Sequence, residues 1–184
     1  MAERRLTSQR RAAASPAAVW AVFADFPNLA DHWGGLKGSR LVGDQRQGVG
    51  ARREVDLAPV GSMVETVTVW EEGRTLTTTN QPSRLVPLKQ AEARLTLEPA
   101  GDGTAMTFDY RYVPKGGPMG RLIGPVIDRM LRTNFESMLA AVEEAASTGR
   151  PKPAAARAAG SAAFGTRTSH QRRPDLVRRR AGGL

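Results

Sequence analysis

The middle of the chain, Lys37–Val113, alternates between apolar and polar residues in six short runs separated by turn residues. Alternation with a period of two predicts strands, and Val55, Met63 and Val67 share the apolar parity across one hairpin. A more polar first strand is expected over Arg5–Ala13. The six later strands are predicted over Lys37–Val42, Val49–Leu57, Met63–Glu71, Arg74–Asn80, Ala91–Glu98 and Thr104–Val113. Strands with one apolar and one polar face indicate an antiparallel sheet that is covered on one side.

The segment that follows the strands predicts the covering element. From Met119 to Val142, apolar residues recur every three or four positions. This spacing is typical of a long amphipathic helix, which we expect to end near Ala146. Pro125 falls inside the segment and is expected to kink the helix or to mark its start.

Two short helices are predicted between the first strand and the other six. The segment Ser15–Trp33 reads SPAAVWAVFADFPNLADHW. Ser15 suits a helix N-cap and Pro16 suits the first helical position, where its missing N–H leaves no bond unmade. Pro27 ends the first helix, because the residue before a proline avoids the helical region. A second short helix is expected over Asn28–His32, with Trp33 directly after it.

The charge of the chain is unevenly distributed. The net charge is +9, yet residues 1–146 hold 18 Lys and Arg against 17 Asp and Glu. Residues 147–184 hold 9 against 1, and they are rich in Ala, Arg, Pro and Gly without apolar periodicity. We therefore expect a near-neutral folded domain over residues 1–146 and a disordered basic tail over residues 147–184. Nucleic acid would bind only through that tail.

Several classes of protein are excluded by composition. The chain has no cysteine, so a disulfide framework, a cysteine-ligated zinc site and a thiol nucleophile are ruled out. No apolar run is long enough to cross a bilayer, and no apolar signal-peptide core follows the early arginines. These features predict a cytoplasmic protein. No metal and no cofactor are expected, and the sequence leaves the oligomeric state open.

In this order, the elements resemble the START-like, or SRPBCC, superfamily with its helix-grip (Bet v 1-like) fold. The nearest branch is the one called polyketide cyclase/dehydrase and lipid transport. The resemblance spans about Arg4–Ala146 and leaves the tail out. It rests on SPAAVWAVFADFPNLADHW, on VGARREV at Val49–Val55, on VETVTVWEEGRTL at Val64–Leu76 and on the closing GPMGRLIGPVIDRMLRTNFESMLAAVEEAA.

The resemblance implies an α+β helix-grip fold. A curved antiparallel sheet of about seven strands would wrap around the long C-terminal helix, with an internal cavity between them. Members of the superfamily use this cavity to bind lipids, polyketides, hormones or quinones, and a minority catalyse cyclisation or dehydration in it.

Arg53 and Glu65 are the sharpest candidates for a functional pair. Both have the parity of the apolar face, and a hairpin that pairs residue 57 with residue 61 places them opposite each other. An inward charge needs a partner or water. The pair is thus either an ion pair near the rim of the sheet or a polar anchor in an apolar pocket.

Other candidates share the inward faces of the sheet and the helix. Tyr110 and Tyr112 lie beside Phe108, and their hydroxyls would bond either to the backbone or to a ligand oxygen. Asn134 lies close to the apolar stripe of the long helix, either in the cavity or at the helix edge. The residues predicted to line the cavity are Trp33, Arg53, Val55, Glu65, Val67, Leu95, Phe108, Tyr110, Tyr112, Ile127, Met130 and Asn134.

Asp31 and His32 do not make a convincing acid–base pair, because adjacent residues of a helix do not face each other. We expect His32 to be exposed beside Trp33. No second histidine outside the tail supports a metal site or a triad.

Three functional hypotheses follow. The leading one is a non-catalytic binding or carrier module for a hydrophobic small molecule such as a lipid or polyketide. The second is a polyketide cyclase/aromatase-type enzyme that holds a flexible substrate, with Arg53, Glu65, Tyr110 and Tyr112 as its acid–base and enolate-stabilising groups. The third is a nucleic-acid-associated protein that binds through its basic tail.

Overall fold

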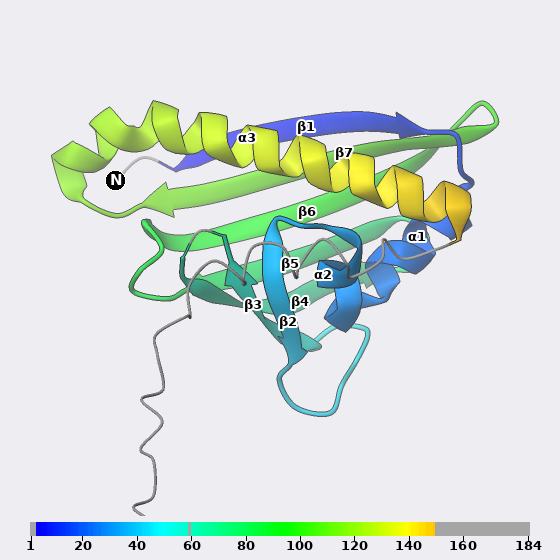
Figure 1. Ribbon diagram of the computed structural model, residues 1–184, viewed down its shortest axis with the longest axis horizontal. Coiled ribbons are helices and arrows are strands. Elements are labelled where there is room, and N and C mark those ends of the chain that lie inside the picture. The colour runs from blue at the N-terminus through cyan, green and yellow to red at the C-terminus, as the bar shows by residue number, and fades with distance from the viewer. Residues whose placement is uncertain (1–2, 59, 150–184) are drawn as a thin grey trace, which may run out of the picture. The chain divides into compact units, whose positions relative to one another are not determined.

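The computed structural model describes residues 3–58 and 60–149, which form one antiparallel sheet and its covering helices (Figure 1). The seven strands are ordered β1-β7-β6-β5-β4-β3-β2. The strands are β1 (Arg4–Ala12), β2 (Leu36–Leu41), β3 (Arg52–Leu57), β4 (Ser62–Glu71), β5 (Thr75–Pro82), β6 (Leu88–Ala100) and β7 (Gly103–Pro114). The helices are α1 (Pro16–Ala24), the 3-10 helix η1 (Phe26–Asn28), α2 (Leu29–His32) and α3 (Gly117–Thr148). The predicted helix-grip architecture is therefore confirmed.

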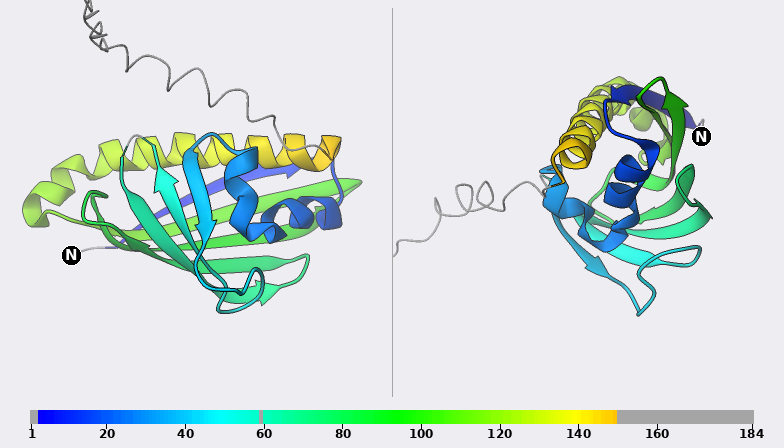
Figure 2. Two further views of the ribbon diagram at one scale, coloured as in Figure 1. Left: turned by 60° about the horizontal axis from the view of Figure 1, so that its bottom comes forward. Right: turned by 90° about the vertical axis from the view of Figure 1, so that its right-hand side faces the viewer.

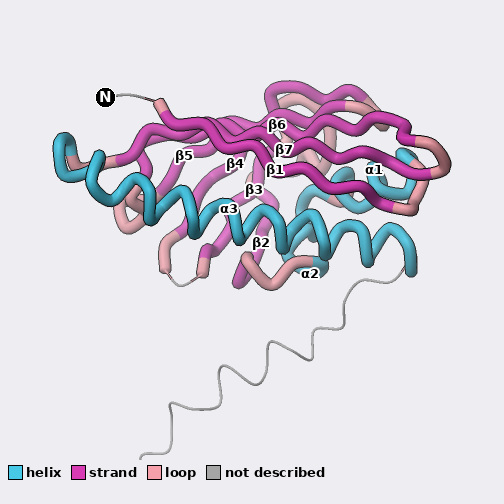
Figure 3. Tube along the Cα trace, turned by 90° about the horizontal axis from the view of Figure 1, so that it is seen from above, coloured by secondary structure: helices cyan, strands magenta, loops and turns pink. Residues whose placement is uncertain are grey.

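The sheet is curved, and its concave face holds the helices. In the right-hand view of Figure 2, the strands curl around α1 and α3. Seen from above, α3 runs beside β1 along the length of the sheet (Figure 3). Every neighbouring pair of strands is antiparallel, so each strand alternates between this covered face and the outer face. The period of two in the sequence is the signature of that arrangement.

The β3–β4 hairpin has the register that the sequence predicts. The backbone N–H of Leu57 donates to the carbonyl of Gly61 at 2.9 Å, and Arg53 lies opposite Glu65. Gly61 has a φ of 103°. Glycine alone adopts this conformation without steric cost, so it sets the turn and thereby the register of both strands.

The α1–η1–α2 segment closes one end of the sheet. The Ser15 hydroxyl accepts a hydrogen bond from the Ala18 N–H at 3.3 Å, which confirms the predicted N-cap, and α1 ends before Phe26. The second α-helix begins at Leu29 rather than Asn28, because residues Phe26–Asn28 form a separate 3-10 turn.

The helix α3 supplies the cover for the rest of the concave face. Its buried side chains include Ile127, Phe135, Leu139 and Val142. Their spacings of eight, four and three residues place them in one stripe on one side of the helix. Other apolar residues that the sequence placed in this stripe are exposed: Ile123 by 40%, Val126 by 71% and Met130 by 50%. These three are spaced three and four apart, so they form a second face beside the buried one. Pro125 lies inside the helix and does not mark its start.

Ionic contacts fasten α3 to the edge of the sheet. Asp128 on α3 accepts hydrogen bonds from the Arg4 guanidinium on β1 and, at 2.6 Å, from the Tyr112 hydroxyl on β7. Further along the helix, Glu143 accepts from Arg10 at 2.5 Å. The Arg4 hydrogen bonds hold the pKa of Asp128 below its usual value, with the Tyr112 hydroxyl adding to the effect against partial burial.

We predict that Asp128→Asn destabilises the protein by about 1–2 kcal/mol at pH 7, since a partly exposed charged hydrogen bond is lost. A carboxyl whose pKa is lowered by folding stabilises the native state above its unfolded pKa, and that contribution disappears as the pH falls through the folded pKa. The difference in unfolding free energy between the wild type and Asp128→Asn should therefore shrink between about pH 5 and pH 3. Urea denaturation across this range measures it. Asp102→Asn, in the exposed β6–β7 turn, is the control; a pH-independent difference for Asp128→Asn would contradict the assignment.

Candidate ligand cavity

A cavity of about 320 Å³ lies between the concave face of the sheet and α3. Its walls join two clusters of buried residues. One cluster contains Phe26 and Trp33, together with side chains of α1. The other contains Tyr110 of β7 and Phe135 of α3. The volume falls within the range of small-molecule sites. Small side chains on strand β6, such as Ala93, leave this space open.

Arg53 and Glu65 are the charged side chains among the described residues that line the cavity. The Arg53 Nε donates to Glu65 Oε2 at 2.6 Å, and Nη2 donates to the same oxygen at 2.5 Å. The remaining nitrogen of the guanidinium donates to the carbonyl of Phe26, whose ring lies 4.2 Å from the guanidinium carbon. The side chains of Arg53 and Glu65 are only 6% and 13% exposed. The ion pair predicted from the sequence is therefore present, and it is buried rather than solvated at the rim.

A second polar group faces the cavity from β5 and β7. Thr78 and Asn80 are both buried, and the Thr78 hydroxyl donates to Asn80 Oδ1 at 2.9 Å. The Asn80 side chain also acts on Tyr110, because hydrogen bonding from it lowers the pKa of the Tyr110 hydroxyl. Burial, followed by the nearby Glu65 carboxylate, raises the pKa of the Tyr110 hydroxyl, and the Asn80 hydrogen bond opposes this only in part. Tyr110 is therefore an uncharged phenol that can donate a hydrogen bond.

The sequence analysis missed Thr78 and Asn80, although a signal was present. The strand β5 reads TLTTTNQP, and Leu76, Thr78 and Asn80 occupy alternate positions of one face. Leu76 marks that face as inward, so two polar residues at the following alternate positions indicate a polar patch on the covered side.

Nine of the residues predicted to line the cavity do so in the structure. They are Trp33, Arg53, Glu65, Leu95, Phe108, Tyr110, Ile127, Met130 and Asn134. Asn134 thus lies on the cavity rather than only at the helix edge. Trp33 is held there by its Nε1–H, which donates to the Ser137 hydroxyl of α3 at 3.0 Å.

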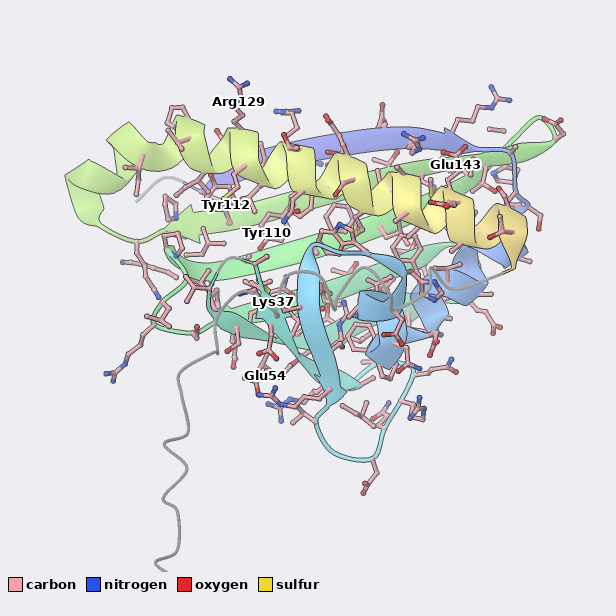
Figure 4. All side chains as sticks on the ribbon, viewed as in Figure 1. Lys37, Glu54, Tyr110, Tyr112, Arg129 and Glu143 are labelled. Atoms are coloured by element: carbon pink, nitrogen blue, oxygen red, sulfur yellow. The ribbon has the colours of Figure 1, made fainter. Side chains whose placement is uncertain are left out.

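Three predicted lining residues are elsewhere. Val55 and Val67 have the inward parity, but they do not line the cavity, because both are fully buried in the core cluster that also holds side chains of α1 and η1. Tyr112, labelled in Figure 4, donates its hydroxyl to Asp128 of α3 and does not line the cavity. Parity in the sequence predicts the face of each side chain but not which part of that face a helix covers. Tyr112 is accordingly removed from the candidate catalytic set.

The expectation of an exposed His32 is wrong. The side chain is half-buried, and its Nδ1 is buried without a hydrogen-bond partner. His32 does not line the cavity, so it has no route to a ligand there. Over the described ranges 3–58 and 60–149, no three His, Cys, Asp or Glu side chains gather in a way that would hold a metal ion. No helix within the same ranges is both long and apolar enough to span a bilayer.

The β5–β6 loop forms one side of the cavity mouth. Leu85, Val86 and Pro87 of this loop line the cavity, and Leu85 is 69% exposed. The Lys115 ammonium, just after β7, donates to the carbonyl of Ser83 at 2.9 Å and of Val86 at 2.8 Å. A third, longer bond of 3.3 Å reaches the carbonyl of Arg84. One lysine therefore ties the mouth loop to the strand that precedes α3.

A family profile described as polyketide cyclase / dehydrase and lipid transport matches residues 3–147. The chain belongs to that family. The match agrees with the resemblance found in the sequence motifs, and it covers nearly all residues that the structure describes. No curated protein matches the chain. Residues 150–184, which hold most of the predicted tail, lie outside the described residues, and the domain division after residue 146 stays a prediction.

Solved structures share the fold of this family member at low sequence identity. TTHA0849 from Thermus thermophilus is 17% identical with a TM-score of 0.68, over 79% of this chain and 99% of its own. The Zhui aromatase/cyclase from Streptomyces sp. R1128 is 15% identical with a TM-score of 0.66, over 79% and 94%. Ara h 8.0201 is 13% identical with a TM-score of 0.62, over 80% and 99%. These matches establish the helix-grip fold.

We predict that Arg53→Met lowers the free energy of unfolding by about 3 kcal/mol, because it leaves the Glu65 carboxylate buried without its partner. Adding Glu65→Leu should recover most of this loss, since an apolar pair of similar size has no charge to desolvate. Chemical denaturation of both single variants and the double variant measures the coupling. Additive losses in the double variant would contradict a buried, mutually dependent pair.

Replacing Lys115 tests the tie across the mouth. Lys115→Met keeps the apolar stem and removes the ammonium, so amide hydrogen exchange in residues 83–87 should become about tenfold faster. Lys89→Met, at an exposed position one residue into β6, is the matched control. Unchanged exchange in Lys115→Met would show that other contacts hold the loop.

Proposed function

We propose that this member of the family binds and carries a hydrophobic small molecule, such as a lipid or polyketide, in the cavity beneath α3. The observation that carries the proposal is the cavity itself: a walled space of about 320 Å³ whose lining is mostly apolar, with a few buried polar groups at one side. Such a combination is typical of small-molecule sites, where apolar walls give affinity and a few polar atoms give orientation. The family description, which includes lipid transport, supports it.

An enzymatic role as a polyketide cyclase or aromatase is the second candidate. It is supported by the neutral Tyr110 phenol and the Arg53–Glu65 pair in one cavity. A phenol can stabilise an enolate oxygen by hydrogen bonding, and a walled cavity can fold a flexible chain so that its own carbons meet. A carrier is favoured because the guanidinium and the carboxylate of that pair are bonded to each other, which leaves neither poised as a free acid or base.

Two further predictions from the sequence remain proposals. A role in nucleic-acid binding rests on the basic tail, where deletion of residues 147–184 should abolish any association with RNA or DNA. The cytoplasmic location stays an expectation from the sequence.

Filling the cavity tests the carrier proposal. Ala93→Phe, on the lining of β6, should weaken binding of the neutral fluorophore 1-aminoanthracene at least about tenfold, because the ring occupies the space that the ligand needs. Fluorescence titration of the full chain measures the affinity. Ala105→Phe, on the outer face of the neighbouring strand β7, is the control and should bind as the wild type does.

Two outcomes would contradict the proposal. The first is a wild-type protein that neither binds the fluorophore nor shows a co-purifying small molecule in native mass spectrometry. The second is turnover of a poly-β-ketone chain by the wild type that is lost in Tyr110→Phe, which would favour the enzyme instead.

A further inference from the structure

We propose that the ligand of this cavity is uncharged and carries an oxygen that accepts a hydrogen bond from the Tyr110 hydroxyl, as a ketone, ester or quinone-type carbonyl does. The inference rests on the proposed function and narrows its ligand class. It predicts that uncharged carbonyl compounds bind more tightly than fatty acids and other amphiphiles with an ionised head group.

The charges that line the cavity cancel each other. Arg53 directs Nε and Nη2 to one Glu65 oxygen, and Nη1 to the Phe26 carbonyl. The ring of Phe26 covers one face of the guanidinium. Because both side chains are almost fully buried, the pair is desolvated and tightly coupled. The described lining therefore presents one bonded ion pair rather than a free cation or a free anion.

This arrangement disfavours a charged ligand of either sign. A carboxylate head group beside Arg53 would lie close to Glu65, and two carboxylates in a dry site repel each other. An ammonium beside Glu65 would meet Arg53 in the same way. An ionised ligand would also lose its own hydration without gaining an unpaired counter-charge among the described lining residues. An uncharged ligand incurs neither penalty.

Thr78 and Asn80 of β5 act in series on Tyr110 of β7. This series, here called the relay, orients the Tyr110 hydroxyl as a hydrogen-bond donor. The Asn80 amide oxygen already accepts a hydrogen bond from the Thr78 hydroxyl. The amide nitrogen of Asn80 is therefore the group that can donate to the Tyr110 oxygen. When the amide N–H donates to the Tyr110 oxygen, the Tyr110 O–H is left to point elsewhere. Tyr110 lines the cavity, and its hydroxyl stays protonated. The relay thus directs a hydrogen-bond donor at a ligand oxygen, with Thr78 and Asn80 as positioning residues.

The other polar side chains of the lining do not change the preference for an uncharged ligand. Trp33 uses its indole N–H on Ser137. Asn134 adds an uncharged amide from α3, on the opposite wall. The rest of the described lining is apolar and suits a hydrocarbon or aromatic body.

Three ten-carbon probes that differ in head group test the ligand class. Displacement of 1-aminoanthracene from the full chain at pH 7.5 is measured with 2-decanone, decanoate and decylamine, which are neutral, anionic and cationic. We expect 2-decanone to bind at least about tenfold more tightly than either ion, because each ionised head group loses hydration without gaining a counter-charge. Tighter binding of decanoate or decylamine, or displacement by none of the three, would overturn the inference. A wild type that does not bind 1-aminoanthracene would instead count against the proposed function.

Variants assign the effect to particular side chains. Tyr110→Phe should weaken 2-decanone about fivefold relative to the affinity for 1-aminoanthracene measured in the same variant, because one neutral hydrogen bond is lost. Tyr112→Phe, two residues along the same strand with its hydroxyl bonded to Asp128, is the matched control and should bind both as the wild type does. Equal effects of the two variants would contradict the role of Tyr110.

Glu65→Gln tests the charge argument directly. It leaves the Arg53 guanidinium without its counter-charge, so decanoate should gain affinity and overtake 2-decanone. Circular dichroism establishes that the variant is folded. Should it not fold, the three-probe series on the wild type and the Tyr110→Phe comparison still decide the inference. Unchanged head-group selectivity in folded Glu65→Gln would overturn the charge argument.

Discussion

The packing of α3 against the concave face of the sheet is the contact on which the rest of the molecule depends. A curved antiparallel sheet has one apolar face that must be covered, and α3 is the one long helix in the described part of the chain. The cover is incomplete. Leu139 and Val142 fill one stretch of the interface completely, whereas small side chains such as Ala93 leave space between the sheet and the helix in another. A cavity therefore forms where a second layer of large side chains would otherwise lie.

The Arg53–Glu65 pair has two roles that follow from one geometry. It ties the helical segment at Phe26 to strands β3 and β4, and it faces the cavity. A buried ion pair is seldom a net source of stability, because desolvation offsets the attraction between the charges. Its presence is more readily understood as a means of placing polarity in an apolar site while keeping that site neutral.

The fold could be predicted from the sequence because it depends on local patterns. Alternation identified the strands, Ser15 and Pro16 marked the first helix, and the turn near Gly61 set the register that places Arg53 opposite Glu65. The residues that line the cavity could be predicted only in part. The alternation of a strand places a side chain on one face of the sheet, but it does not say what covers that side chain. Val55 and Val67 were assigned to the cavity for that reason, yet both are buried in a core cluster with side chains of α1 and η1. The relay of Thr78 and Asn80 was missed, since polar residues within a threonine-rich strand resemble a solvated face.

The polar side of the cavity is built across strands that are distant in sequence. Arg53, Glu65 and Asn80 lie in one row across β3, β4 and β5, and Thr78 and Tyr110 lie in the next row on either side of Ala93. Within each row the side chains are neighbours because the register fixes them, so the hydrogen bonds need little rearrangement on binding. A rigid, preorganised polar wall opposite an apolar helix orients a ligand by its head group. The same wall limits the chemistry available, since its guanidinium and carboxylate already satisfy each other.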